Sequence, residues 1–228
     1  MTKLNLSQVT LDDLQQLVEL TDDGIQDAPW SGWATIPLSD HDLHAADEIM
    51  GRLRRFDATL VNEATIWGRV VYPMLMLAET DGVQAWSQVP LHANVGGVEL
   101  IGVLDGAIGR PIAGVLDVPW LLVVEAKRGV DATSPQWQLY GEMLAAAAAH
   151  ARRRPRPVHE IHGCMTVADV FKFVRAEVRF ATGGKPGVAI TSSREFTAKT
   201  EAREVLATLK AAVRHGLTMY GAATSAAT

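Results

Sequence analysis

Only one cysteine, Cys164, is present among the 228 residues of this chain. A single thiol cannot form an intrachain disulfide, which excludes the small secreted domains that disulfides hold together. Long apolar runs are also missing, since no stretch approaches the roughly 20 residues that a membrane-spanning helix needs. Residues 1–6 show no apolar core typical of a signal peptide. Together these absences predict a cytoplasmic protein with no membrane partner.

An excess of basic residues is absent as well. Lysine and arginine number 21 against 26 aspartates and glutamates, and the formal net charge is -5. This balance excludes a uniformly basic surface, although it leaves room for a local basic groove. With 48% hydrophobic and 21% charged residues, the composition is typical of a globular protein. The length favours one domain and permits two.

Two apolar segments, residues 98–108 and 120–127, are the most informative part of the chain. Runs of this kind predict strands that are covered on both faces. The first run contains Asp105, and the second ends with Glu125 and Lys127, which share one face because side chains alternate along a strand. Burying an unpaired charge is expensive. Two carboxylates and one ammonium close together would be explained if they held a divalent metal.

Helical and extended patterns alternate along the rest of the chain, which indicates the α/β class. The predicted elements, in order, are a helix capped by Thr10, a loop over residues 22–37, a long helical segment over 39–78 that Pro73 kinks or divides, a strand at 83–91, the two strands above, a helix over 136–150 behind Ser134 and Pro135, strands at 159–166, 170–178 and 188–191, a helix over 198–214, and a frayed end at 221–228. We divide the chain into an N-terminal extension (1–38), a core (39–195) and a C-terminal helix with its tail (196–228).

The pattern Asp105…Glu125-Ala126-Lys127 resembles the signature of the PD-(D/E)XK nuclease superfamily, an acid on one strand followed by acid-x-Lys on the next. Leu104 stands where the name of the motif has proline. The order of elements over residues 63–178 also resembles the restriction-endonuclease-like α-β-β-β-α-β core, a mixed central sheet flanked by helices. The resemblance implies that Asp105, Glu125 and the carbonyl of Ala126 bind Mg²⁺ or Mn²⁺, hard ions that prefer oxygen ligands. Lys127 would then position or help activate the attacking water. The alternative is a salt-bridged strand end, with Glu125 paired to an arginine and Lys127 in solvent.

Glu63 is the only charged member of a predicted helical stripe that is otherwise apolar. The stripe consists of Leu53, Phe56, Leu60, Glu63, Trp67 and Val70. In many members of the superfamily a glutamate from the first core helix completes the metal site, so the resemblance implies that role for Glu63. Alternatively, Glu63 lies at the edge of the stripe with its carboxylate in water.

Gln136 and Tyr140 are four residues apart and therefore share one helical face. They match the Gln-x-x-x-Tyr pair of the RecB-type branch, which would place them at the active site. The alternative is a polar helix start with one half-buried tyrosine. The run Arg152, Arg153 and Arg154 is a candidate contact for a nucleic-acid backbone, or else a solvated helix end.

A second, weaker metal candidate is the group His41, His44, Asp47 and Glu48, whose alternative is an exposed polar helix start. His92, His159 and His162 follow no spacing that indicates a site. Cys164 has no activating neighbour in sequence and is expected to be a small core residue.

The resemblance implies a magnesium-dependent nuclease, a phosphodiester hydrolase acting on DNA. The alternative is a nuclease-fold module without catalysis that binds nucleic acid or a protein partner, including a second copy of itself. The intact acid and lysine residues favour the enzyme, whereas the acidic net charge favours the alternative.

Overall fold

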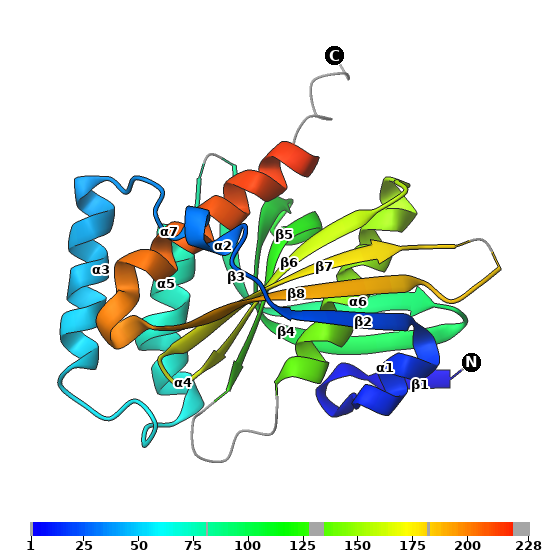
Figure 1. The fold of residues 1–228 in the computed structure, drawn as a ribbon, viewed down its shortest axis with the longest axis horizontal. Coiled ribbons are helices and arrows are strands. Elements are labelled where there is room, and N and C mark those ends of the chain that lie inside the picture. The colour runs from blue at the N-terminus through cyan, green and yellow to red at the C-terminus, as the bar shows by residue number, and fades with distance from the viewer. Residues whose placement is uncertain (1, 81, 128–134, 182, 221–228) are drawn as a thin grey trace.

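A mixed β-sheet runs through the molecule and carries the helices on its two faces (Figure 1). The computed structural model describes residues 2–80, 82–127, 135–181 and 183–220. Within them, the sheet has eight strands, of which seven follow the order β1-β4-β5-β6-β7-β8-β2, and the eighth, β3, pairs with β4 off this path. The strands are β1 (Thr2–Asn5), β2 (Glu19–Ile25), β3 (Gln84–Val95), β4 (Val98–Ile112), β5 (Val115–Lys127), β6 (His159–Val167), β7 (Val170–Arg179) and β8 (Gly187–Thr197).

Helices cover both faces of this sheet and bury a separate apolar core on each. The helices are α1 (Leu11–Leu17), α2 (Trp30–Trp33), α3 (Asp40–Leu53), α4 (Glu63–Ile66), α5 (Tyr72–Leu77), α6 (Gln136–Arg153) and α7 (Ala198–Tyr220). One core lies between the sheet and α6, with α1 beside it. The other lies between the opposite face and α3, α5 and α7, which Figure 1 shows together at one end of the sheet. No helix in the described ranges is both long and apolar enough to span a membrane.

Strands β3, β4 and β5 form an antiparallel meander, and α6 then leads to a parallel neighbour of β5. β3 pairs antiparallel with β4, β4 pairs antiparallel with β5, and β5 pairs parallel with β6. The predicted α/β class and the placement of residues 83–91, 98–108 and 120–127 in one mixed sheet are confirmed. Gly106 pairs with Val124, so the next step of the same register sets Asp105 opposite Glu125.

The faces of β6 are divided by the alternation of its side chains. Ile161 belongs to the core under α6. A Cβ added at Gly163 would lie against Leu139 and Met143 of that helix. Cys164 belongs to the opposite core, under α7. Residues of even number in this strand therefore face α7, and residues of odd number face α6.

The long helical segment expected over residues 39–78 is not one helix. Ser39 caps α3 as a capping box, but α3 ends at Leu53, and α4 begins only at Glu63 behind its cap Asn62. Leu60 is 76% exposed, so the apolar stripe predicted across residues 53–70 was wrong. The local reason is that Asp57 and Asn62 accept hydrogen bonds from nearby backbone amides, which favours a turn and a new cap over a continuous helix. Pro73 lies in the first turn of α5, where it is compatible with helix.

The N-terminal segment contributes two strands, which the sequence had not indicated. β1 pairs with β4, and β2 occupies part of the predicted loop 22–37 and pairs with β8. β2 is almost entirely exposed and polar, so it lacks the alternation that marks a half-buried strand. β8 and α7 extend beyond the predicted 188–191 and 198–214. The expected cap Ser134 and the tail 221–228 lie outside the described residues, and Pro135 occupies the N-cap of α6.

Candidate active site

Asp105, Glu125 and Lys127 come together where β4 and β5 run side by side. An Oδ2 atom of Asp105 accepts a hydrogen bond of 2.8 Å from the backbone N–H of Ala126. The Nζ atom of Lys127 forms an ion pair with Oε1 of Glu125. Glu125 is fully buried, and the Lys127 side chain is 24% exposed. Among the residues that the structure describes, the ion-pair partner of Glu125 is this lysine, and Lys127 is not free in solvent.

The other oxygen of Glu125 is held by α6. The Nε2 amide of Gln138 donates to Oε2 of Glu125 at 2.8 Å and to Oε1 of Glu142 at 3.0 Å. Glu142 is fully buried. We call Asp105, Glu125, Lys127, Gln138 and Glu142 the acid cluster. Gln138 is placed so that one amide group orients two carboxyl groups.

Gln138 and Glu142 were missed at the level of sequence, although a signal was present. Glu142 is the only charged residue in the apolar stretch 139–149, and it lies one helical turn after Gln138. Glu142 is a lone carboxylate on an apolar helical face, which is the pattern that had indicated Glu63.

Burial and neighbouring negative charges perturb the carboxyl groups of the acid cluster. Burial, and then the charge of Asp105, raise the pKa of Glu125 to about 7. Burial, and then the charge of Glu125, raise the pKa of Glu142 well above its ordinary value. Burial acts to lower the pKa of Lys127, but the hydrogen bond and charge of Glu125 outweigh it and raise that pKa. Lys127 is therefore charged at neutral pH, while the two buried carboxyl groups compete for protons.

The donor set fits a hard divalent ion. Carboxylate oxygens predominate, and Mg²⁺ and Mn²⁺ prefer such ligands. The Oε2 atom of Glu142 is buried and has no hydrogen-bond partner among the described residues. A bound cation would offset the repulsion that raises the pKa of Glu125.

Glu63 is linked to the acid cluster by its charge, through an effect on Lys127. It is the first residue of α4 and is exposed. Its negative charge is among those that raise the pKa of Lys127. Glu63 is thus close enough to act electrostatically, although it is not part of the buried stripe expected for it. Its role as a metal ligand stays a prediction.

Gln136 and Tyr140 face away from the acid cluster. The Tyr140 hydroxyl donates to Oδ2 of Asp22 on β2 at 3.2 Å. Burial, and then the charge of Asp22, raise the pKa of Tyr140, and a hydrogen bond with Gln136 acts in the opposite direction. Tyr140 is two residues from both Gln138 and Glu142, which is about 200° around the helix. Gln136 and Tyr140 therefore lie on the side of α6 that faces β2. The polar residues of α6 that lie beside Glu125 are Gln138 and Glu142.

The arginine run lies at the opposite end of α6. Gln138 and Arg152 are 14 residues apart, which corresponds to about 20 Å along the helix. Arg153 pairs with Asp117 at 2.6 Å, and Arg154 donates to the backbone carbonyl of Tyr220 at 2.8 Å. Arg152 is exposed. A nucleic-acid contact at this run would thus be remote from the acid cluster.

The residues of the weaker metal candidate on α3 form separate pairs and do not share one partner. Asp47 pairs with Arg203 of α7 at 2.6 Å, whereas His44 lies 3.5 Å from Glu48. His41 lies 3.9 Å from Asp42. Cys164 is fully buried, and burial raises the pKa of its thiol, so the expectation of a core residue is confirmed.

Comparison with known proteins adds no family to these observations. No protein-family model matches the chain, and no curated protein matches it in sequence. The chemistry of the acid cluster is therefore the basis on which a function can be inferred.

Proposed function

We propose that this protein is a metal-dependent nuclease that hydrolyses phosphodiester bonds in DNA at the acid cluster. The observation that carries the proposal is the contact between Asp105 on β4 and the Glu125-Ala126-Lys127 segment of β5. An acid on one strand, set against acid-x-Lys on its antiparallel neighbour, is the arrangement expected for the PD-(D/E)XK signature.

The topology supports the same proposal. A helical segment over α4 and α5 leads into the β3–β4–β5 meander, and α6 then crosses to β6, which is parallel to β5. This order is the one expected for a restriction-endonuclease-like core. β1, β2, β7, β8 and α7 extend the sheet and cover it beyond that core.

Asp105 and Glu125 would hold Mg²⁺ or Mn²⁺, together with the carbonyl of Ala126 and with Glu63. When bound, the ion would supply charge neutralisation at the phosphate and a lowered pKa for the attacking water. Lys127 would hold that water by hydrogen bonding, and its positive charge would favour the developing hydroxide.

Gln138 would act as a positioning residue for Glu125. Its amide fixes the carboxylate plane by bonding to Oε2, which leaves Oε1 beside Lys127. Ligands held in this way by an outer partner keep their orientation when the metal dissociates. Access for a substrate is from the side of Lys127 and Asp105, because Glu125 itself has no exposed surface.

The test is a cleavage assay on plasmid DNA, linear duplex, single-stranded DNA and RNA, with Mg²⁺, with Mn²⁺ and with a chelator. We expect metal-dependent cleavage that Lys127→Ala lowers by about 10²–10⁴-fold, the range for a group that handles a proton in the transition state. Asp105→Asn should abolish cleavage and weaken metal binding. Lys3→Ala is the matched control, because Lys3 pairs with Glu99 at the far end of β4.

The opposite result would be equally informative. If the wild type cleaves none of these substrates and binds neither ion, the protein is better described as a non-catalytic module. Electrophoretic mobility shift on the same nucleic acids and sizing in solution would then separate nucleic-acid binding from a protein partner or homodimer.

A further inference from the structure

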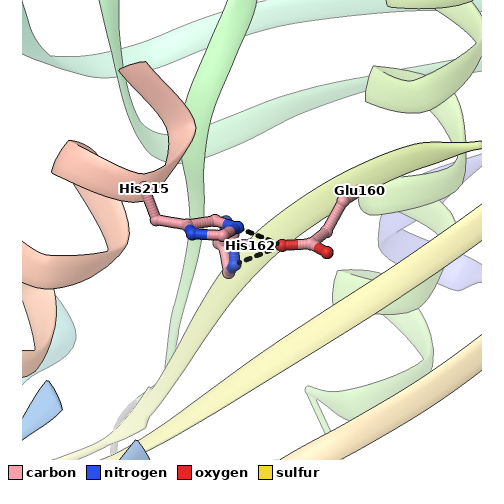
Figure 2. Close-up of side chains that lie close together, drawn as sticks. All are labelled: Glu160, His162 and His215. Atoms are coloured by element: carbon pink, nitrogen blue, oxygen red, sulfur yellow. Dashed lines mark hydrogen bonds and ion pairs between the residues drawn. The ribbon is translucent and has the colours of Figure 1, made fainter. Parts of the chain in front are cut away.

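A second polar cluster lies on the opposite face of the sheet, under α7. Figure 2 shows Glu160 and His162 of β6 and His215 of α7, with their side chains pointing at one another. Glu160 and His162 have even numbers and so share the α7 face of β6, away from the acid cluster. We call these three residues the histidine cluster.

The donor atoms of the histidine cluster converge on one point. Oε1 of Glu160 lies 2.8 Å from Nε2 of His215 and 3.2 Å from Nε2 of His162. One ligand atom from each residue lies within 4.8 Å of the other two. Zinc bonds of about 2.0–2.1 Å in a tetrahedral site place neighbouring donor atoms about 3.4 Å apart. The two separations from Oε1 of Glu160, 2.8 and 3.2 Å, lie about 0.2–0.6 Å below that value, so small side-chain shifts would admit the ion.

His162 provides the second, independent observation. Its side chain is only 3% exposed, and its Nε2 atom has no well-oriented hydrogen-bond partner among the described residues. Its 3.2 Å contact with Oε1 of Glu160 therefore leaves this buried atom poorly satisfied, which is costly and calls for an explanation. The atom points at Glu160 and His215, so a ligand between the three residues would satisfy it.

We propose that Glu160, His162 and His215 form a binding site for a divalent transition-metal ion of the zinc class. Two imidazoles and one carboxylate are a donor set that such ions prefer, whereas Mg²⁺ favours oxygen ligands alone. Three protein ligands leave a fourth position open for water or a small ligand. The side chain of His215 is 39% exposed, which gives that position a route to solvent.

Neighbouring groups hold the three ligands in place. Arg175 pairs with Oε2 of Glu160 at 2.6 Å, so the carboxylate can offer Oε1 to the ion as a single donor. The ring of Trp33 packs 5.2 Å from the ring of His162 and 5.5 Å from that of His215. Outer partners of this kind fix the orientation of metal ligands and strengthen binding.

The competing explanation is a metal-free network in which both histidines bond to Glu160. The experiment that separates the two starts from chelator-treated full-length protein and adds Zn²⁺ in competition with a chromophoric chelator. We expect one zinc ion per chain in this cluster. His215→Ala should weaken that affinity by at least about 100-fold, because loss of an outer partner alone costs 10–100-fold. His44→Ala, which changes an exposed histidine of α3, should leave it unchanged.

Glu160→Gln provides a second variant, because it keeps the size of the side chain and removes the charged donor. It should also weaken zinc binding, and circular dichroism checks that both variants are folded. If the wild type binds no zinc, or if folded His215→Ala binds as tightly as the wild type, the proposal is wrong. Asp105→Asn should leave zinc affinity unchanged, so the result is independent of the nuclease proposal.

Discussion

Replacing Glu125 by glutamine should become more favourable for stability, relative to the wild type, as the pH rises. The wild-type carboxyl has a pKa near 4.5 when the chain is unfolded and about 7 when it is buried beside Asp105. A group that binds its proton more tightly in the folded state stabilises the fold fully below pH 4.5. That stabilisation is lost as the pH rises to about 7. Glutamine cannot ionise, so the variant escapes this loss.

The magnitude follows from the difference between the two pKa values. At 1.36 kcal/mol for each pKa unit, ionising the buried Glu125 costs about 3 kcal/mol more than ionising it in the unfolded chain. The free energy of unfolding of Glu125→Gln, measured relative to wild type, should therefore rise by about 3 kcal/mol between pH 4.5 and pH 8. For a chain of this size, that corresponds to a relative gain of about 6–12 °C in Tm.

The measurement is urea unfolding or thermal melting of both proteins across this pH range, in chelator. Burial lowers the pKa values of His150, His159 and His162, so their contributions to stability fall as the pH drops. This pH dependence is opposite to that of Glu125. Both proteins contain these histidines, so their contributions cancel when the free energies of unfolding of variant and wild type are subtracted. A difference that stays constant from pH 4.5 to pH 8 would refute the reasoning. At pH 8, Mg²⁺ should restore the stability of the wild type and leave Glu125→Gln unchanged.

Two further substitutions test neighbouring groups. Glu63→Gln should weaken cleavage and the magnesium-induced rise in Tm while changing metal-free stability by less than about 0.5 kcal/mol, as expected for an exposed position; equal shifts and equal cleavage in variant and wild type would make Glu63 a structural residue. Gln138→Leu should lower kcat/KM by about 10–100-fold, because Glu125 loses the partner that orients it. Gln136→Leu is the matched control one half-turn away, and equal losses in the two variants would contradict the assignment of Gln138.

The strands around the acid cluster were predictable because their apolar runs are long and their charges stand out. Asp105, Glu125 and Lys127 could be identified for the same reason, since charged groups inside buried strands need partners. The cap at Thr10, which the structure confirms as a capping box, and the start of α6 at Gln136 also followed from local rules.

The remaining features depend on tertiary contacts that no local pattern encodes. The polar edge strand β2 is formed only because β8 offers it a backbone partner. The helix breaks before Glu63 because the turn at Asp57 and the cap at Asn62 are favoured over the continuous helix that the spacing of apolar residues predicts. His215 reaches His162 only because α7 packs on the sheet, and the two are far apart in the chain.

The alternation of β6 restricts how its sequence can change. Glu160 and His162 face α7, while Gly163 lies against α6, where an added Cβ would come within 2.7 Å of the sulfur of Met143. Inserting or deleting one residue before Glu160 would exchange the two faces, because the period of a strand is two. Two charged or polar side chains would then enter the apolar core under α6, and Cys164 would take the crowded place of Gly163. We therefore expect this strand to tolerate no change in length.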